Sequence, residues 1–195
     1  MILESSYAFF IVTSLYQNPR WLARNKLRIK ISWNFLISSL KCSVFQVDQN
    51  TVIDEPSREH FIFPFKEQSS HSTVQFLKMA IKHFGYKPKI IQTDNGFEFT
   101  HFKETKQVHP LDLLCQELGI EHKLIRPRTP RHNGKVERSH RNDNRRFYQH
   151  LTFYSYDDLI KQMKIYLYRS NQLPMQTLGW KSPIDIRKAL LGASS

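Results

Sequence analysis

Apolar and polar residues alternate with two different periods along the chain, which predicts strands interleaved with helices. The apolar runs Thr51–Ile53 and Phe61–Phe65 flank a polar turn at Asp54–Arg58, so the sequence predicts an antiparallel hairpin. The next segment predicts a helix, because it carries apolar residues at helical spacing: Val74, Leu77, Ile81 and Phe84. The segment ends at Gly85, a residue suited to a helix C-cap.

Short apolar runs and amphipathic segments continue in the second half. Ile90 and Ile91 predict a buried strand that leads to Asp94, because Pro88 and the turn pair Asn95-Gly96 bound the run. The remaining predicted elements are a helix over 110–118, a strand over 120–125, and helices over 133–150 and 156–169. The order ββαβα with a further strand and two helices indicates a mixed α/β fold.

The 195 residues have room for one main domain. We expect an atypical basic segment over 1–43, a core over 44–170 and a C-terminal tail over 171–195. No acidic residue occurs between Ser5 and Val47, whereas basic residues are frequent there.

Charge narrows the range of partners. Lys and Arg outnumber Asp and Glu by 29 to 17, and the net charge of +12 favours a polyanion, with nucleic acid as the leading candidate. A basic protein that is merely soluble is the alternative. The two cysteines, Cys42 and Cys115, do not form a disulfide framework, and the apolar segment Tyr7–Tyr16 is too short to span a bilayer. We expect a cytoplasmic, nucleoid-associated protein without a membrane segment.

Two carboxylates stand where a metal site can form. Asp94 follows a strand, and Glu137 falls in the first turns of a helix for which Asn133 is a good N-cap. Hard oxygen ligands that converge on one point suit two divalent ions in phosphodiester chemistry. The alternative is that Asp94 only opens an Asp-Asn-Gly turn and that Glu137 is a solvated helix residue.

Cations are dense around Glu137. We expect five of them to contact DNA phosphates: Arg131, Lys135, Arg138, Arg141 and Arg145. A solvated helix face is the alternative, with Asp143 as the only nearby acidic partner. The aromatic residues that follow, Tyr156 and Tyr166 among them, share a helical stripe with Leu159 and Met163, so core packing is favoured over base stacking.

The two motifs Ile91-Gln-Thr-Asp94-Asn95-Gly96-x-Glu98-Phe99 and Pro127-x3-Arg131-His-Asn133-Gly134-x2-Glu137-Arg138 resemble the catalytic core of DDE-type insertion-sequence transposases and retroviral integrases. The resemblance covers about residues 44–190. It implies an RNase H-like fold, a mixed sheet flanked by helices, with magnesium dependence, DNA-end cleavage and strand transfer.

The resemblance also implies roles for single residues. Asp94 would be the second catalytic carboxylate and Glu137 the third, holding two Mg²⁺ ions for which Mn²⁺ can substitute. Asn95, Gly96, Asn133 and Gly134 would be structural. Transposon ends and target DNA would be the partners, with a homo-oligomer as a further expectation.

The first acid of the family pattern is absent. The expected window, Trp33–Leu40, contains no acid, and Asp48 and Asp54 could replace it only by rearrangement. We therefore expect an opening strand that is altered or lost, and an upstream coding frame or gene boundary that has changed. Activity should then be severely impaired.

The leading interpretation is a transposase catalytic core with impaired two-metal cleavage and strand transfer. Two alternatives stay open: a non-catalytic DNA-binding remnant of a transposase, and an RNase H-like nuclease.

Overall fold

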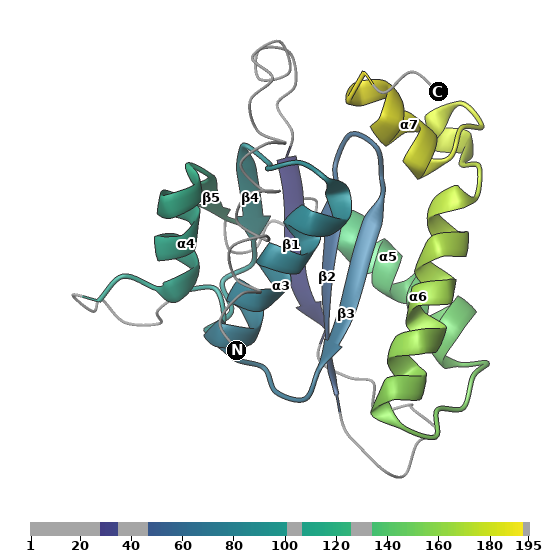
Figure 1. Ribbon diagram of the computed structural model, residues 1–195, viewed down its shortest axis with the longest axis horizontal. Coiled ribbons are helices and arrows are strands. Elements are labelled where there is room, and N and C mark those ends of the chain that lie inside the picture. The colour runs from purple at the N-terminus through teal and green to yellow at the C-terminus, as the bar shows by residue number, and fades with distance from the viewer. Residues whose placement is uncertain (1–27, 35–46, 101–106, 126–133, 193–195) are drawn as a thin grey trace, which may run out of the picture.

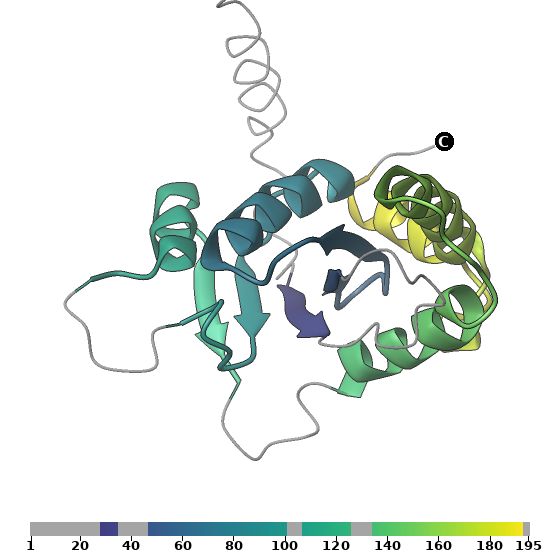
Figure 2. The ribbon, with the colours of Figure 1, turned by 90° about the horizontal axis from the view of Figure 1, so that it is seen from below.

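A five-stranded mixed sheet with helices on both faces forms the fold (Figure 1, Figure 2). The computed structural model describes residues 28–34, 47–100, 107–125 and 134–192. The strands are β1 (Arg28–Asn34), β2 (Asp48–Asp54), β3 (His60–Phe65), β4 (Ile90–Thr93) and β5 (Glu121–Leu124). The helices are α3 (Ser70–Phe84), α4 (Pro110–Leu118), α5 (Gly134–Asp143), α6 (Tyr156–Gln172) and α7 (Pro183–Leu190).

Strand order is β3-β2-β1-β4-β5, so β1 occupies the centre of the sheet. It pairs antiparallel with β2 and parallel with β4. The opening strand is therefore altered but not lost, and it lies at Arg28–Asn34, mostly ahead of the expected window at 33–40. The alternating pattern of Arg28-Ile-Lys-Ile-Ser indicates this strand, whereas the window at 33–40 follows from the residue spacing of the family pattern.

Helix α3 is set by its two ends and its apolar stripe. The Ser69 side chain accepts a hydrogen bond from the Ser72 amide, and Gly85 ends the helix in the left-handed region at φ 72°. A larger side chain at Gly85 would be strained there. The predicted helix therefore forms, and it begins at Ser70, four residues before Val74, its first apolar position.

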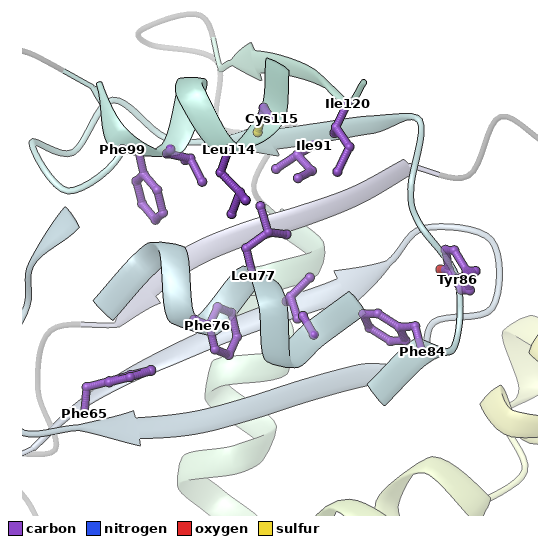
Figure 3. Packing of buried hydrophobic residues seen from close by; sticks show 13 residues of the cluster. Phe65, Phe76, Leu77, Phe84, Tyr86, Ile91, Phe99, Leu114, Cys115 and Ile120 are labelled. Carbon is purple, nitrogen blue, oxygen red and sulfur yellow. The ribbon is translucent and has the colours of Figure 1, made fainter. Parts of the chain in front are cut away.

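One face of the sheet packs against α3 and α4 (Figure 3). Phe76, Leu77 and Phe84 from α3 meet Ile91 from β4 and Leu114 from α4, all of them at most 6% exposed. Side chains alternate between the two faces of a strand, and Ile91 lies on the face of β4 that packs against α3.

The opposite face packs against α5 and α6 (Figure 2). Between Asn144 and Tyr148 the helix α5 continues as a π-helix, which turns Phe147 and Tyr148 into this second core. Leu159 and Met163 of α6 are buried there, and Tyr156 and Tyr166 pack against them. The prediction that these aromatic residues serve packing is confirmed.

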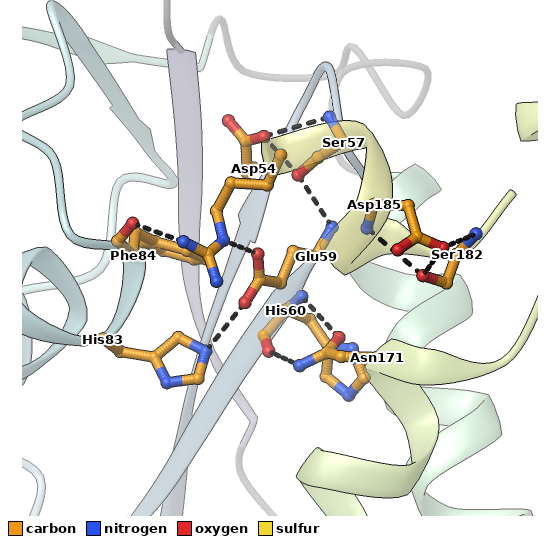
Figure 4. Close-up of polar contacts among 10 residues, drawn as sticks. Asp54, Ser57, Glu59, His60, His83, Phe84, Asn171, Ser182 and Asp185 are labelled. Atoms are coloured by element: carbon orange, nitrogen blue, oxygen red, sulfur yellow. Dashed lines mark hydrogen bonds and ion pairs between the residues drawn. The ribbon is translucent and has the colours of Figure 1, made fainter. Parts of the chain in front are cut away.

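A buried ion pair fastens α7 to the hairpin (Figure 4). Glu59, 1% exposed, pairs with Arg187 Nε and with His83 Nε2 at 3.2 Å. Arg187 also donates to the Phe84 carbonyl at 3.1 Å. The C-terminal helix is therefore joined to the β2–β3 turn and to the end of α3. No helix within the described ranges is long and apolar enough to cross a membrane.

Replacing Arg187 with Ala leaves the Glu59 carboxylate buried without its cation. We expect the free energy of unfolding to fall by on the order of 3 kcal/mol, measured by urea denaturation. Lys188→Ala, which removes an exposed charge one residue away, should change it by less than about 0.5 kcal/mol. Equal midpoints for the two variants would show that the pair does not hold α7.

Candidate active site

Asp94 directly follows β4 and lies in a turn that hydrogen bonds of the next two residues stabilise. Its Oδ1 accepts a hydrogen bond from the Gly96 amide at 3.2 Å. Asn95 Nδ2 donates to the Ile125 carbonyl at 2.9 Å, which ties the exit of β4 to the exit of β5. Asp94 is partly exposed.

The Glu98 carboxylate packs over Gly96, in the space that a side chain at residue 96 would occupy. Glu98 is 4% exposed, and burial, together with the charge of Asp94, raises its pKa. In the sequence, Glu98 stands out only as part of the motif that contains Asp94. Its position two residues after a turn glycine was the signal that a second carboxylate approaches Asp94.

Glu137 lies in the first turn of α5 and is exposed. Helix α5 packs on β1 and β2. One turn after Glu137, His140 is buried, and its Nδ1 lies 3.4 Å from the Thr51 hydroxyl of β2. Side chains three residues apart share a helix face, so Glu137 lies near the strand row that contains Thr51.

Strand register identifies the position that corresponds to the missing acid. Ser32 of β1 pairs with Thr51, and continuing the β1–β4 register from Lys30 and Gln92 brings Ser32 level with Asp94. None of the residues of β1 is acidic.

Neither of the two acids considered as substitutes lies at this level. Asp54 pairs with Ile29, which pairs with Ile91, so Asp54 is three residues from the Asp94 level, about 10 Å along the strands. It is 1% exposed and accepts bonds from the Ser57 amide and hydroxyl. Asp48 lies three residues from the same level in the other direction.

The described residues do not supply a complete set of ligands for two metal ions. Within residues 28–34, 47–100, 107–125 and 134–192, no three or more His, Cys, Asp or Glu side chains converge to hold an ion. Asp94 follows β4 and Glu137 lies on α5, and a two-ion site needs more oxygen ligands than two carboxylates supply.

The predicted DNA-contacting cations are described only in part. Arg138, Arg141 and Arg145 are exposed on α5 and its π-helical extension. Gly134 and Lys135 are the first two residues of α5. Arg131 and Asn133 lie outside the described residues, as does the Lys135 side chain.

Asp143, the one nearby acid that the solvated-face alternative offered as a partner of these cations, is buried instead. Its side chain is 2% exposed and accepts a hydrogen bond from the Tyr166 hydroxyl at 2.7 Å. His60 Nε2 lies 3.6 Å from its Oδ1. Asp143 is buried because α5 lies against α6 at this point. The sequence pattern did not specify this contact.

The fold has relatives among solved structures. The mixed sheet in this order, with helices on both faces, has the RNase H-like fold of two integrase cores that match at low identity. The bovine immunodeficiency virus (BIV) integrase core matches with a TM-score of 0.64 at 17% identity, over 87% of this chain and 98% of that one. The HTLV-2 integrase catalytic core, solved in complex with magnesium, matches with 0.62 at 19%, over 83% and 96%.

Two family models described as an integrase core domain match residues 37–130 and 118–183, and the chain belongs to this family. A further relative is the retrovirus-related Pol polyprotein from transposon TNT 1-94 of Nicotiana tabacum, 33% identical over 95 residues. Those residues are 47% of this chain and 6% of the polyprotein.

His140 provides a test of how α5 is seated. Burial lowers the pKa of His140 from 6.5 to about 4, so the unfolded chain binds its proton first as the pH falls. The free energy of unfolding should therefore decrease between pH 6.5 and 4, by on the order of 2 kcal/mol from this residue.

Chemical denaturation across this range should show a shallower decrease for His140→Gln than for the unchanged chain. His150→Gln, at an exposed position in the turn after the π-helix, should keep the full slope. Identical slopes for all three proteins would show that His140 is not buried as described.

Proposed function

We propose that this chain is a DNA-binding integrase-type core of a DNA transposition system, whose phosphodiester cleavage and strand transfer are impaired. The observation that carries the proposal is the central strand β1, which is paired on both edges but has Ser32 at the level of Asp94. An intact fold with an incomplete ligand set favours DNA binding without efficient chemistry.

Charge and exposure support DNA as the substrate. Arg138, Arg141 and Arg145 are exposed within three turns, and no ion pair joins them to an acid among the described residues. Unpaired guanidinium groups in a row suit a phosphate backbone. Mg²⁺ is the expected ion, because one of the similar cores was solved with magnesium and carboxylate oxygens are its usual ligands.

Assembly into oligomers on transposon ends and target DNA belongs to the same proposal. The similar HTLV-2 core was solved in a dimeric form, and a simian T-cell lymphotropic virus intasome also matches, with a TM-score of 0.62 at 19% identity. That match covers 83% of this chain and 54% of the intasome chain.

A repair of β1 tests the proposal. We expect Ser32→Asp to supply the carboxylate at the level of Asp94 and to raise Mg²⁺-dependent nicking and strand transfer by at least about 100-fold. The assay uses supercoiled plasmid and labelled DNA from the ends of the element, with Mg²⁺ or Mn²⁺. Ser32→Asn is the matched control, since it has nearly the same shape without the charge.

Adding Glu137→Gln to the repaired chain should abolish the recovered activity. Joined strands would identify a transposase, and nicks alone would favour the nuclease alternative. Salt-sensitive DNA binding with no product from any variant would favour the non-catalytic remnant. Full activity in the unchanged chain would contradict the proposed impairment.

A further inference from the structure

A pocket of about 370 Å³ opens between α5, α6 and the β2–β3 turn. Arg138, Asn142 and Arg146 line it from α5 and its extension, recurring every four residues along one flank. Glu137 does not line the pocket. The pocket is therefore separate from the candidate active site, although both use α5.

Three arginines surround the pocket. Arg58 approaches from the β2–β3 turn, and Arg138 and Arg146 approach from the α5 side. No ion pair joins these guanidinium groups to a carboxylate within the part of the chain that the structure describes. With Asp143 as the one carboxylate in the lining, the charge of the site favours an anion.

The floor of the pocket is buried and polar. Asp143 is 2% exposed, and its Oδ2 has no hydrogen-bond partner. His60 is 5% exposed, and its Nε2 also has none, since Asp143 Oδ1 is 3.6 Å away. Asn171 fixes the His60 backbone through bonds of 3.1 and 2.8 Å (Figure 4). The lining of this cationic pocket therefore includes two buried residues, Asp143 and His60, each with a polar atom that has no hydrogen-bond partner.

A simple inorganic anion does not match this floor. It would satisfy the arginines, but it would bring a second negative charge to Asp143 and leave Oδ2 without a donor. A ligand that suits both parts carries an anionic group for the rim and an N–H group for the floor. A volume of 370 Å³ lies in the range of small-ligand pockets, about 300–1,000 Å³.

We propose that this pocket binds one unpaired nucleotide of a DNA strand. The phosphate lies among Arg58, Arg138 and Arg146. The base edge carries an amino group that donates to Asp143 Oδ2, beside a ring nitrogen that accepts from a His60 protonated at Nε2. Cytosine and adenine present this pair of groups, whereas thymine presents a carbonyl in place of the amino group.

A neighbouring hollow continues the cationic surface for the next phosphate. Arg145, Arg146, Asn142 and His150 line it, so Asn142 and Arg146 border both hollows. A strand with one base in the pocket would then follow the π-helical end of α5. This inference rests on the proposed DNA substrate and adds an unpaired strand as the form that is recognised.

Fluorescence anisotropy with labelled 12-residue oligonucleotides tests the inference on the full chain at one fixed salt concentration. The probes are oligo(dC), oligo(dT), an abasic strand with the same phosphates, and a duplex. We expect oligo(dC) to bind about tenfold more tightly than oligo(dT) or the abasic strand. Equal affinity for all three single strands would overturn the inference.

Two variants assign the effect to the pocket. Arg146→Ala should weaken oligo(dC) binding about tenfold, whereas Arg169→Ala, which removes an exposed arginine outside both hollows, should weaken it less than about twofold. Asp143→Asn should reduce the preference for dC over dT to less than about twofold. The base preference of the unchanged chain decides the question even where Asp143→Asn does not fold.

The duplex separates this inference from the proposed function. Duplex binding without any preference among the single strands would overturn the nucleotide pocket alone. Absence of binding to every probe would overturn the DNA substrate and the pocket together.

Discussion

The hydrogen bonding of β1 along both of its edges is the constraint on which the rest of the fold depends. The β2–β3 hairpin lies on one side of β1, and the parallel pair β4 and β5 lies on the other. Without a central strand, the two halves would have no shared sheet on which to place Asp94 and α5. Pairing of this kind uses backbone groups, so it persists whatever side chains the strand carries.

Because backbone pairing does not depend on side chains, the fold can be retained while the set of candidate metal ligands is incomplete. The two cores, built on α3 and α4 and on α5 and α6, involve apolar side chains that do not overlap with the candidate metal ligands. Carboxylates that hold ions contribute little to packing and repel one another when no ion is bound. Loss of one such carboxylate therefore removes chemistry while leaving the hydrophobic terms that stabilise the domain in place.

Local signals explain what the sequence could predict. Helix α4 forms at Pro110–Leu118 as predicted, because Pro110 and Gly119 mark its ends, and the hairpin follows from the turn between two apolar runs. The buried positions of Asp143 and Arg187 against their partners could not be predicted in the same way. Each depends on a partner far along the chain: Arg187 and Glu59 are 128 residues apart, and Asp143 turns inward only because Tyr166 and His60 lie across the pocket. The roles of Asp94 and Glu137 came from motif resemblance, and strand register then identified Ser32 as the position beside them.

The π-helical turn at the end of α5 has a geometric consequence for the surface of the protein. Gln149 bonds back to Asn144, so this turn holds one residue more than an α-helical turn would. The added residue brings Phe147 and Tyr148 side by side into the core and turns Arg145 and Arg146 outward together. The exposed arginines at this end of α5 consequently diverge. Arg146 lines both hollows, whereas Arg145 lines only one of them. A helix without this irregularity would present a single line of charge, whereas this one presents its arginines along two diverging directions.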